Sequence, residues 1–239
     1  MELEEFSNNI NKKMNLINIT VNENEINNFY NYMRMLLDWN EKINLTAITD
    51  EKEIILKHFI DSVTINKYIK KNCKLIDIGT GAGFPGVPLK ILNDDLSVVL
   101  LDSLNKRINF LKEVIAFLKL EKITPIHDRA EELGSKKEYR EQFDIATSRA
   151  VAPLNYLLEY MLPFVKVGGY CICMKGGNIE TEINESKEAL RKLGGKIEKI
   201  DYINLPESEI ERNIIIIKKI KNTPEKYPRK AGIPKKSPL

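Results

Sequence analysis

Several residue types are scarce in this chain of 239 residues, and each shortage argues against a class of protein. Three cysteines cannot all pair with one another and fall short of a zinc quartet, so neither a disulfide framework nor a metal site is expected. No run of about 18 apolar residues occurs, so no membrane association is expected. The polar start MELEEFSNNINKK lacks the basic and apolar parts of a secretory signal. We therefore expect a cytoplasmic protein.

Charge is nearly balanced over most of the chain and is concentrated at its end. The 37 basic and 34 acidic side chains give a net charge of +3. Residues 225–239 contain five basic side chains and one acidic side chain, so the other 224 residues carry −1. The C-terminal tail, residues 222–239, has four prolines and no periodicity, so we expect it to be extended or to become ordered only on binding. We expect this basic, proline-rich tail to serve RNA binding alone and to leave cofactor affinity unchanged.

Helical periodicity dominates residues 1–70. Apolar side chains recur at helical spacing between Ile26 and Leu37. A break at 44–50 precedes a second helix, whose start is marked by Asp50 and Glu53 as an N-terminal cap. We therefore predict an N-terminal helical extension. Its aromatic side chains fit core packing better than stacking on nucleic-acid bases: Tyr30, Tyr32 and Trp39.

From residue 71 to residue 221, short apolar runs alternate with amphipathic stretches. Strands are predicted at 73–79, 97–102, 123–127, 143–148 and 168–175, with helices between them. The last two apolar runs, GGKIEKIDYINL and RNIIIIKKI, have no helix between them and predict an antiparallel hairpin. This order predicts an α/β core with a mostly parallel seven-stranded sheet and helices on both faces. Cys171 and Cys173 alternate along one of these strands and are expected in the core.

The turn after the first predicted strand is rich in glycine. LIDIGTGAGFPG places Gly79, Gly81 and Gly83 directly after Asp77 and the end of the strand. Glycine is needed where the backbone bends sharply and approaches a ligand, and in open α/β sheets this edge binds ligands. Asp102 ends the second strand and is expected either to accept hydrogen bonds from ribose hydroxyls or to cap the following helix. The pattern predicts a nucleoside cofactor.

Two cofactor classes compete for this turn. Gly81, Gly83 and Gly86 match the dinucleotide fingerprint G-x-G-x-x-G, but the match begins two residues late and Pro85 interrupts it. The pattern acid-x-Gly-x-Gly-x-Gly, beginning at Asp77, instead resembles motif I of class I S-adenosylmethionine methyltransferases. That cofactor carries a cationic sulfonium and an ammonium group and no phosphate, so a nearby carboxylate favours it and disfavours a pyrophosphate.

Several segments, in order along nearly the whole chain, resemble one family. They include NEKINLTAI (40–48), HFIDS (58–62), DIGTGAGFPGVPL (77–89), SRAVAPL (148–154) and KYPRKAGIPKKSPL (226–239). Together they resemble the RsmG family, formerly glucose-inhibited division protein B, of bacterial 16S rRNA guanine-N7 methyltransferases. The resemblance implies a Rossmann-like class I S-adenosylmethionine methyltransferase. The implied reaction is methylation of N7 of one guanine in the decoding-region loop of 16S rRNA.

The chemistry of that reaction agrees with what the sequence lacks. Guanine N7 has an in-plane lone pair and no proton, so its attack on a sulfonium methyl group needs positioning and desolvation rather than a strong general base. The implied partner is 16S rRNA or the small ribosomal subunit, and a monomer is expected. Three other hypotheses stay open: a methyltransferase for a small molecule, a nicotinamide oxidoreductase, and a non-catalytic RNA-binding factor.

The motifs and the strand ends together predict the site residues. Arg149 follows the fourth strand and can hold the cofactor carboxylate, bind a phosphate or donate to guanine O6. With Asn44 and Arg129 it is expected at the reacting groups. His58 and Asp61, one helical turn apart, form either a functional pair near the cofactor or a structural pair. The cofactor contacts expected are Asp77, Gly79, Gly81, Phe84, Asp102, Ser103, Ala130, Glu131 and Arg149, and the RNA contacts are Lys106, Arg129, Arg212, Arg229 and Lys230.

Overall fold

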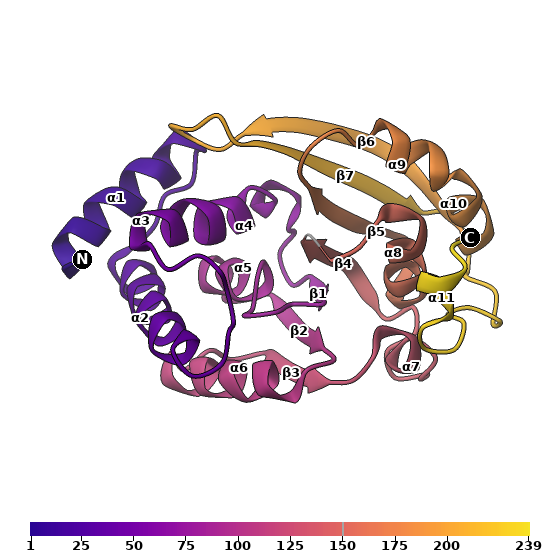
Figure 1. Ribbon diagram of the computed structural model, residues 1–239, viewed down its shortest axis with the longest axis horizontal. Helices are drawn as coiled ribbons and strands as arrows, with labels where there is room; N and C mark the ends of the chain where they lie inside the picture. Colours follow the sequence, from indigo (N-terminus) through magenta and orange to yellow (C-terminus); the bar gives the residue numbers. More distant parts are fainter. Residues whose placement is uncertain (150) are drawn as a thin grey trace.

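The computed structural model describes residues 1–149 and 151–239, and its centre is a seven-stranded sheet (Figure 1). The strand order is β3-β2-β1-β4-β5-β7-β6. Strands β1 to β5 pair in parallel, whereas β7 runs antiparallel to both β5 and β6. The predicted α/β fold with its antiparallel end hairpin is therefore confirmed. The strands are β1 (Lys74–Ile78), β2 (Ser97–Asp102), β3 (Ile123–His127), β4 (Phe143–Arg149), β5 (Val165–Lys175), β6 (Gly195–Asn204) and β7 (Glu211–Lys219).

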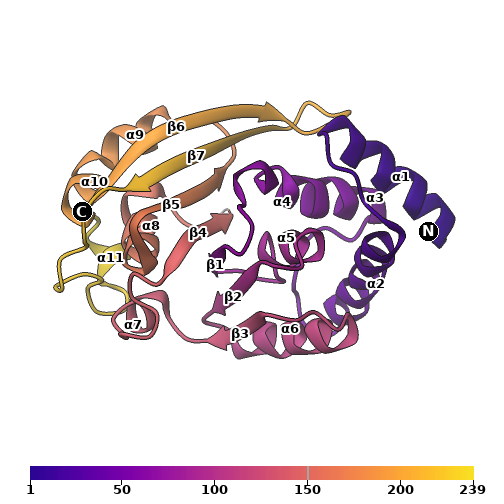
Figure 2. The same ribbon diagram turned by 180° about the vertical axis from the view of Figure 1, so that it is seen from behind.

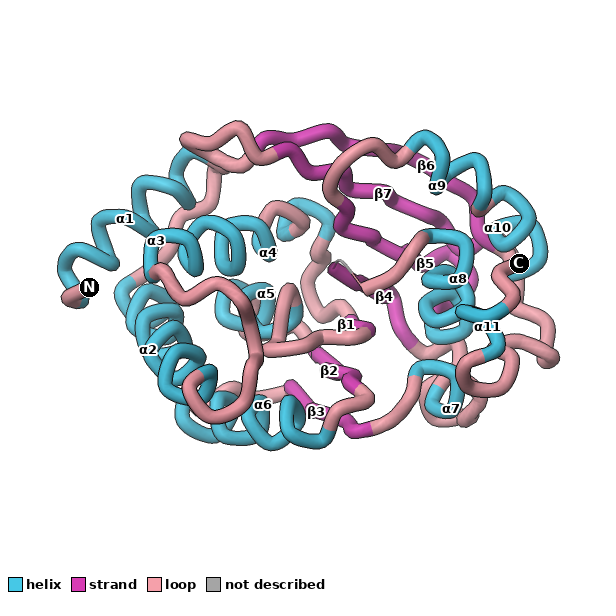
Figure 3. The backbone as a smooth tube through the Cα atoms, viewed as in Figure 1, coloured by secondary structure: helices cyan, strands magenta, loops and turns pink. Residues whose placement is uncertain are grey.

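Helices cover both faces of the sheet (Figure 3). The first 70 residues form α1 (Leu3–Leu16), α2 (Glu23–Asn40), α3 (Glu51–Ile54), a π-helical stretch (Ile55–Ile60) and α4 (Asp61–Val63). The predicted cap is confirmed, because the Asp50 side chain accepts a hydrogen bond from the Glu53 N–H at 2.9 Å. The remaining α-helices are α5 (Gly86–Leu92), α6 (Asn105–Phe117), α7 (Ala130–Leu133), α8 (Leu154–Met161), α9 (Glu180–Glu185), α10 (Lys187–Leu193) and α11 (Ile233–Lys236), and short 3-10 helices lie at Asn66–Tyr68 and Leu162–Phe164.

Alternate residues along the strands pack into two separate cores. Leu75 of β1 packs on the side of α1, α2, α5 and α6, and its neighbour Ile76 packs on the side of α7, α8 and α10. The N-terminal helices therefore share one continuous core with the sheet, although Figures 1 and 2 show them grouped at the end opposite the C-terminus. Cys171 and Cys173 are buried in the second core, as predicted. Within the described residues, no helix is long and apolar enough to cross a membrane.

The C-terminal tail packs against the body of the protein beside α7 and α8 (Figures 1 and 2), so the prediction of an extended tail, ordered only on binding, is wrong. Tyr227 is buried in the second core. The Arg140 guanidinium donates to the carbonyl oxygens of Thr223 at 2.7 Å and Tyr227 at 2.8 Å. Composition suggested disorder because prolines and charges dominate, but one buried ring and these carbonyl contacts compensate for the ordering entropy.

Candidate active site

The glycine turn lies between the carboxyl ends of β1 and β2, beside β4, at the point where the strand order reverses. Gly81 has φ +63° and a side-chain carbon there would meet no atom within 4 Å, so this glycine faces open space. Gly83 has φ +104°, and a side-chain carbon would lie 2.7 Å from the Tyr32 hydroxyl. Tyr32 donates that hydroxyl to the Ala82 carbonyl, so α2 fixes the turn. Tyr32 is buried, as its helical spacing predicted, but its contact with Ala82 could not be predicted from the sequence.

Asp77 lies beneath the turn, so its predicted contact with the cofactor needs correction. The side chain is fully buried, and Oδ2 accepts hydrogen bonds from the Thr80 hydroxyl at 2.7 Å and the Gly86 N–H at 2.9 Å. Oδ1 is buried with no hydrogen-bond partner among the described residues. Burial raises the pKa of Asp77 to about 6, against the opposing effect of its two hydrogen bonds. Asp77 shapes the turn from below and does not line the space above it.

The position of Asp77 also decides against a dinucleotide. A pyrophosphate in that class binds at the N-terminus of the helix after the turn. Here α5 begins at Gly86, and the Gly86 N–H already donates to the buried carboxyl group of Asp77. A phosphate at this place would meet a carboxylate instead of free N–H donors.

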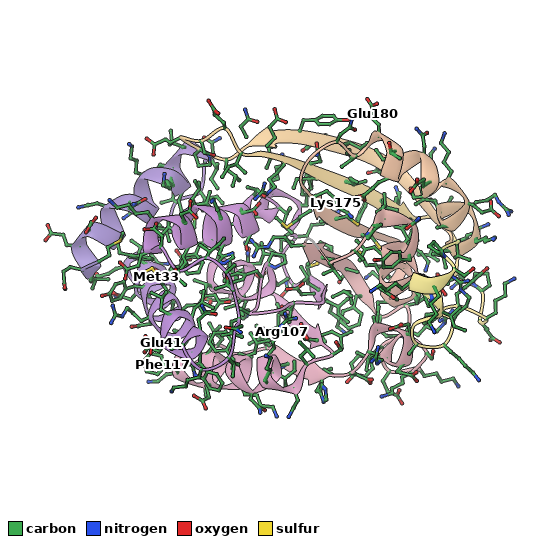
Figure 4. The ribbon with its side chains drawn as sticks, in the orientation of Figure 1. Met33, Glu41, Arg107, Phe117, Lys175 and Glu180 are labelled. Carbon is green, nitrogen blue, oxygen red and sulfur yellow. The ribbon has the colours of Figure 1, made fainter. Side chains whose placement is uncertain are left out.

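Asp102 accepts hydrogen bonds from the backbone on both sides of it, and its contact with ribose hydroxyls stays a prediction. Its Oδ1 accepts from the Leu104 N–H at 2.9 Å, at the start of α6, and its Oδ2 accepts from the Gly81 N–H at 2.9 Å. Arg107 of α6, labelled in Figure 4, donates to the same Oδ2 at 3.2 Å. Arg107 was not predicted from the sequence. Only its position, in the first turn of the helix that follows Asp102, could have indicated this contact.

Two adjoining cavities open at this edge of the sheet. The first, of about 430 Å³, is lined by Thr46, His58, Gly79, Gly81, Phe84, Asp102, Ser103, Arg107 and Arg149, among others. The second, of about 200 Å³, has apolar walls from Ile78, Leu101 and Ala130, with Glu131, Arg129 and Tyr160 beside them. Gly79, Asp102 and Ser103 line both. Of the predicted cofactor residues, all but Asp77 therefore line one cavity or both.

Arg149 is the centre of a charged cluster that joins three elements. Its NH1 donates to the Lys57 carbonyl at 2.9 Å and lies 3.4 Å from Asp61 Oδ2. Arg212 of β7 also reaches Asp61, with Nε 3.1 Å from each carboxyl oxygen. The Arg149 guanidinium lies over the Phe84 ring, 4.9 Å from its centroid. Asp61 thus holds two arginines that come from strands on either side of β5.

The His58 ring fixes the other side of Arg149. The ring stacks on Phe84 with centroids 4.5 Å apart. Arg149 NH2 lies 3.2 Å from Nδ1, and because a guanidinium can only donate, Nδ1 is the acceptor and Nε2 carries the proton. Nε2 lies 2.8 Å from the Thr46 hydroxyl oxygen, which therefore accepts that proton. His58 and Asp61 thus both contact Arg149 and make no hydrogen bond to each other among the described residues. A functional pair near the cofactor stays a hypothesis, since His58 also lines the first cavity.

His58 supports a prediction about pH. Burial, and then the neighbouring Arg149 charge, lower the pKa of His58 to about 3. The unfolded chain therefore binds a proton between pH 6.5 and about 3 that the folded chain does not, so stability falls as the pH is lowered through that window. When the pH is lowered from 7 to 5, we expect His58 to reduce the free energy of unfolding by about 2 kcal/mol.

The measurement is urea unfolding of the wild type and of His58→Gln at both pH values. Between pH 7 and pH 5, the free energy of unfolding should fall by about 2 kcal/mol less in the variant than in the wild type. Asp77, whose raised pKa stabilises the fold as the pH falls, is present in both proteins, so its effect cancels in the comparison. Identical losses in the two proteins would show that His58 is not held neutral in the fold.

The remaining predicted residues are not all brought together. Arg129 is exposed and lines the second cavity, whereas Arg149 lines the first, so the structure separates these two candidates for the reacting centre. Asn44 is exposed on the loop before Thr46 and lines neither cavity. Lys106 and Lys230 are exposed. Arg229 makes an ion pair with the buried Glu159, NH2 to Oε2 2.6 Å, so its predicted phosphate contact is corrected to an anchoring role.

Comparison with known proteins decides the family. Residues 25–214 match the family model described as GidB, rRNA small subunit methyltransferase G. A relative from Clostridium tetani, named ribosomal RNA small subunit methyltransferase G, is 53% identical over 232 residues, covering 96% of this chain and 97% of the relative. A relative of the same name from Acetivibrio thermocellus is 57% identical over 222 residues, 92% of this chain and 91% of the relative. The chain belongs to this family.

Solved structures show the fold over a wider evolutionary range. An S-adenosylmethionine-dependent methyltransferase from Aquifex aeolicus superposes with a TM-score of 0.54 at 16% identity, covering 73% of this chain and 96% of that one. M. jannaschii TYW2, solved in complex with AdoMet, superposes with a TM-score of 0.52 at 17% identity, covering 67% and 77%. The core of this member of the small subunit methyltransferase G family therefore has the Rossmann-like class I methyltransferase fold. The family model ends before the C-terminal tail, whereas the match to the C. tetani relative reaches into it.

Proposed function

We propose that the protein transfers a methyl group from S-adenosylmethionine to N7 of a guanine in the 16S rRNA of the small ribosomal subunit. The observation that supports this most directly is the pair of adjoining cavities over the glycine turn, in a chain of the small subunit methyltransferase G family. In this proposal the protein acts as a monomer in the cytoplasm, where its substrate is assembled.

The donor groups around the two cavities fit this cofactor. The apolar walls of the second cavity suit a purine ring, and the carboxylate of Glu131 suits an exocyclic amino group. Asp102 lies where both cavities meet and suits ribose hydroxyls. In the first cavity, the cationic Arg149 suits the carboxylate of the methionine half. When bound, the cofactor supplies an electrophilic methyl group on its sulfonium.

The residues of the first cavity then have positioning and desolvating roles. Gly81 leaves the approach to the reacting centre open, and Phe84, buried behind it, supports Arg149. His58 has its two ring nitrogens committed to Arg149 and Thr46, so it is not available as a general base. Because guanine N7 carries no proton, the reaction needs none, and alignment of the nucleophile with the methyl group supplies the rate enhancement.

Exposed cations beside the cavities support an RNA substrate. Lys106 lies in the first turn of α6, three residues after Ser103, and Arg129 lies at the second cavity. Lys230 lies on the tail that packs beside α7. Cations placed in this way neutralise backbone phosphates and position a nucleic acid without reading its sequence. The Arg212 side chain is held by Asp61, so it is less free than these cations to reach an RNA phosphate.

The proposal is tested by transfer of labelled methyl groups. Small ribosomal subunits from a strain that lacks the modification should accept label from S-adenosylmethionine in the presence of this protein, and large subunits should not. S-adenosylhomocysteine should inhibit the transfer, and NADH should have no effect. Label on neither subunit, in a protein that binds S-adenosylhomocysteine by calorimetry, would contradict an rRNA substrate.

A further inference from the structure

The C-terminal tail reaches the wall of the second cavity. The Gly232 N–H donates a hydrogen bond to Glu131 Oε1 at 3.0 Å. Glu131 is 7% exposed and lines that cavity. Its other oxygen, Oε2, has no hydrogen-bond donor among the described residues. One oxygen of this carboxylate is therefore held by the tail, and the other is left for a ligand.

The tail is anchored just before this contact by a buried ion pair. Glu159 is fully buried, and Arg229 satisfies both of its oxygens through Nε and NH2, at 2.6–3.1 Å. The Arg229 N–H also donates to Oε1 at 2.7 Å. Glu159 is followed in α8 by Tyr160, which lines the second cavity. The anchor and the Gly232 contact thus fasten the tail at two points, to α8 through Glu159 and to α7 through Glu131.

The end of the tail also carries cations with no acidic partner. Lys230, Lys235 and Lys236 are exposed, and none of them makes an ion pair within the described residues. Two of them follow Gly232 within four residues. A polyanion that binds these cations would hold the segment in its docked position, with Gly232 on Glu131.

We propose that residues 231–239 are part of the cofactor site and couple it to RNA binding. The docked segment fixes Glu131 for the cofactor, and phosphates on its lysines stabilise the docked state. Coupling between two binding sites is reciprocal. If RNA increases the affinity for the cofactor by some factor, the cofactor increases the affinity for RNA by the same factor. This inference rests on the proposed function, because it takes S-adenosylmethionine and rRNA as the two ligands. It replaces the expectation that the tail leaves cofactor affinity unchanged.

The test is a truncation after Lys230. It keeps the Arg229–Glu159 pair and the buried Tyr227, so the anchor is intact, and it removes the Gly232 donor with Lys235 and Lys236. Calorimetry with S-adenosylhomocysteine should show binding about five- to tenfold weaker than in the full chain, about the net effect of one typical hydrogen bond, because the Gly232 contact acts on the cofactor only through Glu131. Small-subunit RNA should tighten this binding in the full chain and not in the truncated one.

Two variants separate the Gly232–Glu131 contact from the binding of RNA by the tail lysines. Gly232→Val keeps the lysines and meets no atom within 4 Å, but its β-branched side chain disfavours the φ of +82° at which the Gly232 N–H meets Glu131, so it should weaken S-adenosylhomocysteine binding as the truncation does. Lys235→Ala with Lys236→Ala keeps the donor, so in the absence of RNA it should bind S-adenosylhomocysteine as the full chain does, but lose the tightening by RNA. Equal binding by the full and truncated chains, with and without RNA, would overturn the coupling. No binding by the full chain would instead refute the cofactor assignment in the proposed function.

Discussion

Replacing Gly81 by aspartate should weaken S-adenosylhomocysteine binding by at least about a hundredfold, or about 2.8 kcal/mol, while the protein stays folded. Gly81 has φ +63°, which aspartate tolerates better than most residues, and a side chain there meets no protein atom within 4 Å. The new carboxylate would instead fill the first cavity. It would also lie beside Asp102, whose Oδ2 accepts the Gly81 N–H, so the like charges would disturb the carboxylate at the junction of the two cavities.

A matched control is Gly168→Asp. Gly168 also has a positive φ, +90°, and open space around it, but it lies near the start of β5, far from the carboxyl ends of the parallel strands. Both variants should have similar melting temperatures, and only Gly81→Asp should lose binding by calorimetry. Undiminished affinity in Gly81→Asp would refute the placement of the cofactor over this turn.

Replacing Arg149 by methionine should lower kcat/KM for methyl transfer by more than about a hundredfold, chiefly through loss of cofactor affinity. Arg149 is the cation that lines the first cavity at the proposed place of the cofactor carboxylate, and a charge-assisted pair lost in a partly buried site costs about 2–3 kcal/mol. The fold should tolerate the change. Asp61 keeps Arg212 on both of its oxygens, so the buried carboxylate of Asp61 is not left without a cation.

A second ligand distinguishes this role from a general disturbance of the site. 5′-Methylthioadenosine has the adenosine part of the cofactor but no amino-acid carboxylate. The Arg149→Met variant should therefore bind it nearly as the wild type does, although it binds S-adenosylhomocysteine poorly. Equal losses for both ligands would assign Arg149 a structural role, and no loss for either, with transfer abolished, would move it to the target guanine.

The sequence predicted those features that depend on short-range pattern. Apolar runs marked the inner strands β1, β4 and β5 because strands in the middle of a parallel sheet are buried on both faces, and the Asp50 cap followed from local spacing. Gly81 was identified because a strand followed by closely spaced glycines leaves few alternatives to a ligand-binding turn. Asp77 was identified too, but periodicity cannot tell a carboxylate that faces a ligand from one that braces the turn from below.

The features that escaped prediction are contacts between residues far apart in the chain. Tyr32 reaches Ala82 from α2, and Arg149 meets Asp61 and His58 across about 90 residues. No local sequence pattern predicts such pairs, because each pair depends on how the helices pack against the sheet. The docking of the tail is the plainest case. Its composition is that of a disordered segment, and only the distant Glu159 and Glu131 give it fixed partners.

Mapping the methylated nucleotide tests the proposed transfer to guanine N7 in 16S rRNA. Small-subunit RNA that lacks the modification is treated with this protein and S-adenosylmethionine, then with borohydride and aniline, which cleave RNA at N7-methylated guanines. We predict a single new cleavage, in the decoding-region loop of 16S rRNA, which Gly81→Asp should fail to produce. Methyl label in the RNA without cleavage, or cleavage elsewhere, would show that the protein does not methylate N7 of this guanine.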